Sequence, residues 1–214
     1  MELIEALKTR RTVRAYQEQP VPDSMVEYLL HEATRAPSAC NIRGWRFIVI
    51  RRKEQLRWLY ENGSASFIPE APQAVLVCYD NRTENSAWND FEQSAAAAIT
   101  CFQLLAHEQG IGSCWICHLP PREEVRRHFG IVPDYTPTAL VTFGYYRTGQ
   151  PTSPRDLSGE VRRVAYEKWD FEPEKRDTAS GLASLARRTA RFLYYLLPKR
   201  AWLRRYALKY EKKF

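Results

Sequence analysis

The sequence lacks the long apolar segments and the cysteine framework that mark membrane and disulfide-rich secreted proteins. No stretch approaches the roughly 18 uninterrupted apolar residues that span a bilayer. The opening MELIEALKTRR has no apolar signal-peptide core. The five cysteines are odd in number and irregularly spaced, which argues against a disulfide framework. We therefore expect a cytoplasmic protein with reduced thiols.

The composition indicates a folded protein with an unevenly distributed charge. Of the 214 residues, 44% are hydrophobic and 13% aromatic, which excludes a disordered or low-complexity chain. The net charge is +7, but residues 178–214 hold ten Lys or Arg and one acid, a charge of +9. Residues 1–177 therefore carry −2, so any affinity for anionic partners belongs to the C-terminal tail.

Hydrophobic spacing predicts a mixture of helices and strands. Apolar residues at helical intervals indicate helices over 2–9, after Pro22, over 53–62 and 88–109, and from near Pro121. Asp23 is expected to cap the second helix. Short runs rich in Val, Ile, Phe and Leu predict strands over 46–50, 74–79, 114–117 and 138–143. Because the order lacks a regular βαβ rhythm, we expect an α+β fold.

Three short segments contain candidate functional residues. RRTVR, residues 10–14, clusters guanidinium groups that bind phosphate well, although such a run also occurs on solvated surfaces. APSACNIRGWRF, residues 36–47, has hydrogen-bonding side chains suited to an amide-bearing heterocycle, or is only a loop leading to a strand. GIGSCWIC, residues 110–117, allows a tight turn that exposes backbone N–H groups, or is only a helix stop before a strand.

In this order and spacing, the three segments resemble motifs of the nitroreductase family. RRTVRAY resembles the family's Arg-Arg-Ser-x-Arg-x-Phe opening, and APSACNIRGWRF its Ala-Pro-Ser loop. GIGSCWIC resembles the family's Gly-Leu-Gly-x-x-Trp-Ile-Gly segment, and PTALVTFGY its late strand. The resemblance covers about residues 1–170. It implies a mostly antiparallel central sheet flanked by helices, in an entwined homodimer that binds FMN at the subunit interface.

The resemblance also assigns residues to the cofactor. The implied FMN contacts are Arg10, Arg11, Thr12, Arg14, Pro37, Ser38, Asn41, Trp115, Ile116, Cys117 and Arg155. The residues of the opening would hold the phosphate and ribityl chain, with Arg155 as a weaker phosphate contact. Those of the loop would reach the flavin of the other subunit. The backbone N–H of Cys117 would face flavin N5, where a donor stabilises arriving electron density.

The family reaction that the resemblance implies is carried by the cofactor. NADH or NADPH reduces the flavin, leaves, and is replaced by a nitroaromatic, quinone or similar electron-poor acceptor. Alternatives are another flavin chemistry on the same fold (reductive dehalogenation, flavin fragmentation or substrate oxidation) or a non-catalytic flavin-binding, membrane-associated accessory protein. Flavin absorbance, and its bleaching by NAD(P)H, would separate these possibilities.

Departures from the family pattern bear on selectivity and on the thiols. Arg43 and Gly44 replace a Gln-Pro pair, so we expect Arg43 to face the acceptor pocket and to favour anionic substrates. Cys114 and Cys117 form a C-x-x-C, which elsewhere serves as a redox dithiol or half a metal site. On an extended strand, however, the two thiols point to opposite faces, and the histidines show no metal spacing. We therefore expect no metal.

The division expected from the sequence is an FMN-binding domain over residues 1–170 and a basic helical tail over 171–214. Apolar residues in the tail alternate with Arg and Lys on either side of Pro198, a pattern typical of basic amphipathic helices. Such helices can lie on an anionic membrane surface, which would make the protein peripheral to the membrane. They can also simply pack on the dimer. Nucleic acid is not an expected partner, because no recognised nucleic-acid module is present.

Overall fold

The computed structural model describes residues 1–82, 88–146 and 189. Its elements, in chain order, are α1 (Leu3–Thr9), α2 (Asp23–Ala33), the 3-10 turn η1 (Ala39–Asn41), β1 (Trp45–Ile50), α3 (Lys53–Glu61), the 3-10 turn η2 (Ile68–Glu70), β2 (Gln73–Asp80), α4 (Asp90–Glu108), β3 (Ile111–Ile116), α5 (Arg122–Phe129) and β4 (Tyr135–Tyr145). The helices and strands predicted from residue spacing within this part of the chain are present, with their ends displaced by a few residues.

The strands form one four-stranded sheet in the order β1-β2-β4-β3, and every neighbouring pair is antiparallel. Trp45 of β1 lies opposite Tyr79 of β2, which lies opposite Thr136 of β4. At the other edge, Ile111 of β3 lies opposite Tyr145. The predicted α+β class and antiparallel sheet are confirmed for the described strands.

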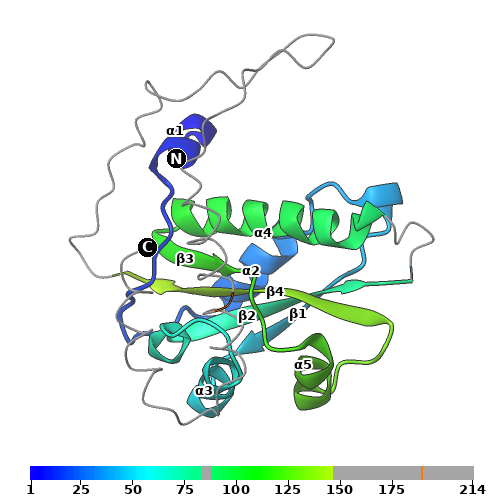
Figure 1. Ribbon diagram of the computed structural model, residues 1–214. Helices are drawn as coiled ribbons and strands as arrows, with labels where there is room; N and C mark the ends of the chain where they lie inside the picture. The colour runs from blue at the N-terminus through cyan, green and yellow to red at the C-terminus, as the bar shows by residue number, and fades with distance from the viewer. Residues whose placement is uncertain (83–87, 147–188, 190–214) are drawn as a thin grey trace. The chain divides into compact units, whose positions relative to one another are not determined.

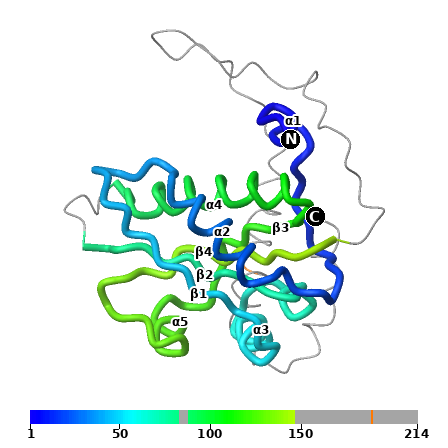
Figure 2. Tube along the Cα trace, turned by 180° about the vertical axis from the view of Figure 1, so that it is seen from behind, coloured from blue at the N-terminus to red at the C-terminus, as the bar shows by residue number. Residues whose placement is uncertain are grey.

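Helices cover both faces of this sheet, α2 and α4 on one side and α3 and α5 on the other (Figures 1 and 2). The inner strand β2 is therefore apolar along nearly its whole length. Val75 and Val77 face the α2/α4 layer, whereas Leu76 and Cys78 face the α3/α5 layer. Since successive side chains of a strand point to opposite faces, one strand supplies two separate cores.

Small residues on α4 permit close packing against α2. Ala95 and Ala98 of α4 and Ala33 of α2 are all buried. Further along α4, Phe102 packs edge-to-face on Phe143 of β4, with ring centroids 5.3 Å apart. This contact places the C-terminal half of α4 over the inner strand β4, next to which β3 begins.

The first two helices differ from the expected pattern: α2 is not capped by Asp23, and α1 does not bury most of its apolar residues. Pro22 occupies the N-cap position of α2, so the expected capping by Asp23 is wrong. Asp23 is instead the first helical residue, and its carboxylate pairs with Arg51. The apolar residues of α1 are largely outside the core of the single chain, since Leu3 and Ile4 are 66% and 61% exposed.

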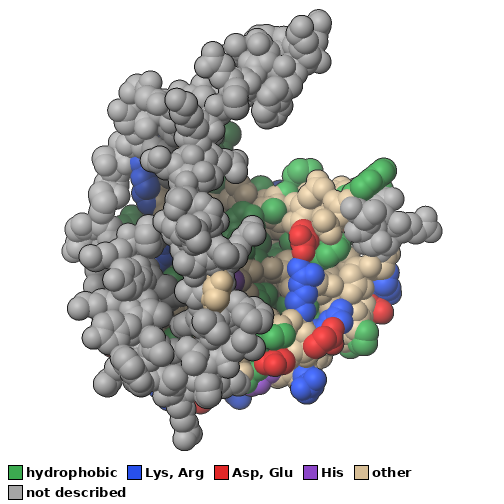
Figure 3. Space-filling view, viewed as in Figure 1, with side chains coloured by type: hydrophobic (Ala, Val, Ile, Leu, Met, Phe, Trp, Pro, Cys, Tyr) green, Lys and Arg blue, Asp and Glu red, His purple; other side chains and the backbone are tan. Residues whose placement is uncertain are grey.

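Charged side chains of both signs are interspersed on the visible face of α5 (Figure 3). Arg122 pairs with Glu92 at 2.5 Å, and Arg126 with Glu123 at 2.9 Å. This local pairing agrees with the nearly neutral charge of residues 1–177. Such exposed pairs contribute little stability individually.

The domain boundary near residue 170, the basic tail and Arg155 lie outside the described residues. Within the described part of the chain, no helix combines the length and apolar character needed to cross a membrane.

Candidate functional site

The arginine-rich segment, residues 10–14, lies along the outer edge of β3. The Val13 N–H donates to the Ser113 carbonyl at 2.9 Å, and Thr12 forms a parallel bridge with Ser113. The close approach depends on Gly112, because a Cβ there would lie 2.8 Å from three Val13 side-chain atoms. The structure thus brings the predicted phosphate-binding segment and GIGSCWIC together.

A buried tyrosine fixes the far end of the same segment. The Tyr16 hydroxyl donates to the Val13 carbonyl at 2.6 Å and also lies 2.9 Å from Thr142 Oγ1. Burial raises the pKa of Tyr16, so it remains a neutral hydroxyl. The Gln17 N–H then donates to the Tyr145 carbonyl at 2.7 Å. Residues 12–17 are therefore held by backbone bonds at both ends.

Two guanidinium groups of the segment, those of Arg11 and Arg14, have different surroundings. Arg11 turns back onto the end of α1, where Nη1 donates to the carbonyls of Lys8 and Arg10 at 2.8 and 2.9 Å. The Arg14 guanidinium lies over the Phe67 ring, 5.7 Å from its centroid. Arg11 thus has a structural role at the end of α1, which residue type alone does not predict.

The expected loop, residues 36–43, contains a concentration of backbone strain. Cys40, Asn41 and Arg43 have φ values of 49°, 55° and 52°, in the left-handed region. Each such non-glycine residue costs roughly 1–2 kcal/mol, with asparagine the best tolerated. Strain of this kind persists only where surrounding contacts impose it, and it often marks functional sites.

Hydrogen bonds inside the loop hold this conformation. Ser38 Oγ accepts from the Arg43 N–H at 3.2 Å, and its carbonyl accepts from the Asn41 N–H at 3.0 Å. Arg43 Nε donates to Asn41 Oδ1 at 2.9 Å. Pro37, Asn41 and Arg43 are exposed. The loop therefore presents polar groups outward.

Ser94 of α4 anchors the loop to the body of the domain. Its Oγ accepts from the Ala39 N–H at 3.0 Å and donates to the Asp90 carbonyl at 2.8 Å. Its carbonyl accepts from Trp45 Nε1 at 2.9 Å. Sequence analysis did not identify Ser94, because a serine within a helix resembles any other until its neighbours are known.

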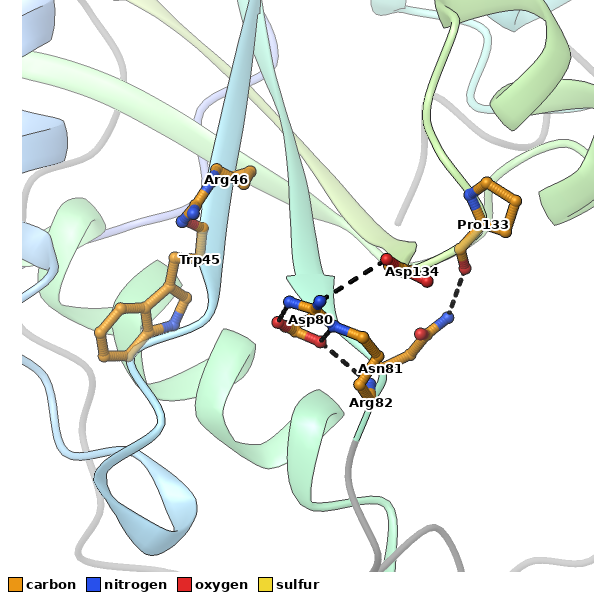
Figure 4. Close-up of polar contacts among 7 residues, drawn as sticks. All are labelled: Trp45, Arg46, Asp80, Asn81, Arg82, Pro133 and Asp134. Atoms are coloured by element: carbon orange, nitrogen blue, oxygen red, sulfur yellow. Dashed lines mark hydrogen bonds and ion pairs between the residues drawn. The ribbon is translucent and has the colours of Figure 1, made fainter.

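The start of β1, which follows the loop, is held by a polar cluster at the end of β2 (Figure 4). The Asp80 N–H donates to the Gly44 carbonyl at 3.0 Å. The Asp80 carboxylate accepts from Arg82 Nε and Nη2 at 2.9 and 2.5 Å, and this hydrogen bonding lowers the pKa of Asp80 to about 2. The pair therefore contributes stability above pH about 4 that is lost as the pH falls towards 2.

Within one chain, the loop and the arginine-rich segment lie at opposite ends of the sheet. Thr12 pairs with Ser113 of β3, which lies opposite Phe143 of β4. Trp45 lies opposite Tyr79 of β2, which lies opposite Thr136 of β4. These two β4 positions are seven residues apart, which corresponds to about 23 Å along the strand. A single small ligand at Thr12 would therefore not contact Asn41 of the same chain.

Trp115, Ile116 and Cys117 complete the predicted site at the end of β3. Ile116 is buried and Trp115 half-buried, while Cys117 follows the strand and is exposed. Trp115 Nε1 is buried, yet it has no hydrogen-bond partner among the described residues. Since buried N–H groups are nearly always paired, this donor is suited to an acceptor supplied by a ligand or a partner chain.

The two thiols of the C-x-x-C differ in their exposure. Cys114 is buried and Cys117 is exposed, and both are free. Burial raises the pKa of Cys114, an effect partly offset by Arg14 nearby. A cluster of metal-ligating side chains is not found in the described part of the chain.

The antiparallel sheet between two helical layers, with the arginine-rich segment along its β3 edge, defines an α+β domain with a cluster of arginines at one edge. The chain matches the family model described as Nitroreductase family over residues 7–62 and 59–145. This chain therefore belongs to the nitroreductase family, as the sequence motifs predict.

Individual relatives agree with this assignment. A provisionally named NADH dehydrogenase/NAD(P)H nitroreductase of Methanothermobacter thermautotrophicus is 34% identical over 173 residues, covering 79% of this chain and 88% of the relative. The solved structure of an FMN-dependent nitroreductase from Clostridium difficile R20291 is 28% identical with a TM-score of 0.68, covering 78% of this chain and 99% of that one. An iodotyrosine deiodinase of Thermotoga neapolitana is 24% identical over 181 residues, covering 72% and 94% respectively.

Proposed function

We propose that the protein is an FMN-dependent NAD(P)H oxidoreductase that reduces nitroaromatic, quinone or similar electron-poor acceptors in a ping-pong reaction. The observation that carries this proposal is the arginine-rich segment held on β3 at Ser113, the strand that leads to Trp115, Ile116 and Cys117. Relatives named for FMN-dependent nitroreductase and NAD(P)H nitroreductase activities support it.

The donors at this edge fit a flavin mononucleotide. Arg10, Arg14 and the Thr12 hydroxyl offer charged and neutral donors to the phosphate and ribityl chain. The buried Trp115 Nε1 offers a further donor to an acceptor-rich group. When bound, FMN supplies the hydride chemistry, and the protein supplies orientation and electrostatics. In this assignment, the Cys117 backbone N–H would be the donor to flavin N5.

A homodimer, with each site built from both chains, accounts for the placement of the loop. Pro37, Ser38 and Asn41 lie in the loop that leads into Trp45, whose position along the sheet is about 23 Å from that of Thr12. A second chain can bring its loop to that edge. The exposed Leu3 and Ile4 of α1 provide apolar surface that a partner chain would cover.

Flavin absorbance and anaerobic reduction of the purified full-length protein test the proposal. We expect bound FMN whose absorbance bleaches on addition of NADH or NADPH and recovers with a nitroaromatic or a quinone. Absence of flavin after incubation with excess FMN would contradict cofactor binding. Bound flavin that neither nucleotide bleaches would favour an accessory protein, and recovery with only a halogenated phenol would favour dehalogenation.

Arg43 is proposed to influence acceptor choice. Its guanidinium is exposed and is oriented by Asn41, so its charge lies at the surface of the loop. We expect Arg43→Gln to lower kcat/KM for anionic acceptors about 3- to 10-fold relative to neutral ones, since one nearby charge is lost. Arg43→Lys should retain most of the preference, and Arg57→Gln, an exposed position on α3, serves as a remote control. An unchanged ratio in Arg43→Gln would reject this role.

A further inference from the structure

His107, on the last turn of α4, contacts the end of α1 immediately before the arginine-rich segment. Its Nε2 lies 2.8 Å from Thr9 Oγ1. A second polar contact joins the same elements, between the Met1 ammonium group and Glu108 at 3.2 Å. Because Leu3 and Ile4 are mostly exposed, these contacts help to position α1, and with it Arg10 and Arg11.

The hydrogen bonds of Thr9 determine which nitrogen of His107 carries the proton. Thr9 Oγ1 donates its single hydrogen to the Glu5 carbonyl at 2.7 Å, so it can only accept from His107. Neutral His107 therefore carries its proton on Nε2, and a second proton would add at Nδ1. The contact with Thr9 is the same in both protonation states.

The charges around His107 oppose its protonation in the absence of an anion. Burial lowers the pKa of His107, and Arg10 and Arg11 lower it further. Glu5 of α1 acts in the opposite direction but is the weakest of these influences. On its own helix, the neighbouring Glu108 is paired with the Met1 ammonium group. His107 thus lies in the positive field of Arg10, the proposed phosphate ligand, and of Arg11.

We propose that His107 couples phosphate binding at Arg10 to uptake of a proton. The inference rests on the proposed function, in which the phosphate of FMN binds at the arginine-rich segment. A dianionic phosphate reverses the local field, so it favours the second proton on Nδ1. Protonated His107 in turn adds a positive charge to the site.

Coupling between proton uptake and phosphate binding makes His107 favour FMN binding at lower pH. The pKa of His107 is lowered in the free protein and rises when the phosphate binds, so the complex holds more protons than the free protein. The ordinary pKa of histidine is about 6.5. We therefore expect His107 to strengthen FMN binding as the pH falls through the range around this value. The phosphate has its own second pKa of about 6 and weakens binding as it protonates, so the two effects must be separated.

A comparison with His107→Gln achieves this separation. The Gln amide can still donate to Thr9 Oγ1 but does not titrate, so the structural contact is kept and the proton linkage is lost. Protonation of the phosphate weakens FMN binding to both proteins alike. Its effect therefore cancels in the ratio of the FMN Kd of this variant to that of wild type. We expect the ratio to rise from about 1 at pH 8 to about 3–10 at pH 6.

The experiment is a titration of the full chain with FMN, followed by flavin fluorescence between pH 6 and 8. His31→Gln, on the exposed surface of α2, is the matched histidine control. Riboflavin, which lacks the phosphate, should give a ratio that does not change with pH. NMR of the His107 ring should show a higher pKa in the FMN complex than in the free protein.

The outcomes distinguish this inference from the proposed function. If wild type fails to bind FMN at any pH, the proposed function fails. If wild type binds FMN but the ratio is flat between pH 6 and 8, or the same pH-dependent ratio appears with riboflavin, then the role of His107 is rejected while the function stands. A ratio that is raised equally at every pH would indicate a purely structural contact and would also overturn the proposal.

Discussion

Replacing Arg10 or Arg14 with alanine is expected to weaken FMN binding by about 1.5–3 kcal/mol, which corresponds to roughly 10- to 150-fold in Kd. The reason is the loss of a charge-assisted hydrogen bond to the phosphate. The backbone bond between Val13 and Ser113 holds the segment on β3 and should survive either change. Fluorescence titration with FMN measures the loss directly.

Controls separate phosphate binding from general damage. Arg57→Ala removes an exposed charge on α3 and should leave the Kd unchanged. Arg14→Ala also removes the contact with the Phe67 ring, so its thermal unfolding should be measured alongside. Riboflavin should bind wild type and both variants alike. Unchanged FMN affinity in Arg10→Ala and Arg14→Ala would remove the segment from the cofactor site.

Gly112→Ala is expected to destabilise the protein by about 1–3 kcal/mol, the usual cost of overpacking, and to weaken FMN binding in addition. Its new Cβ would lie 2.8 Å from Val13 Cβ, Cγ1 and Cγ2, so the segment must move away from β3. That movement displaces the arginines on either side of Val13. Denaturant unfolding and FMN titration together measure the two effects.

Two variants test whether the contact with Val13 is the cause. Adding Val13→Ala to Gly112→Ala removes two of the three close atoms and should partly restore FMN affinity. Gly110→Ala strains a glycine at φ +70°, but its Cβ would meet nothing within 4 Å. We therefore expect it to lower stability and leave FMN affinity nearly unchanged. If Gly110→Ala weakens FMN binding as much as Gly112→Ala, the contact with Val13 is not the decisive one.

The helices and strands were predictable because each has a local periodic signal. β2 reads as an uninterrupted apolar run because it is an inner strand covered on both faces, and α4 shows apolar residues at helical spacing. The expected cap at Asp23 was wrong because Pro22 takes the N-cap position and the carboxylate pairs with Arg51, 28 positions further along the chain. A local pattern cannot contain such a partner.

By itself, the sequence determined the α+β class, the family and the residue types of the site, since these depend on periodicity and on short contiguous motifs. Only the tertiary structure decided that Arg11 folds back onto α1, that Ser94 anchors the strained loop and that His107 lies beside Thr9. It also decided that the loop and the arginine-rich segment lie at opposite ends of the sheet. Each of these depends on side-chain direction or on strand register between residues distant in the sequence, and such pairings are set by packing of the whole domain.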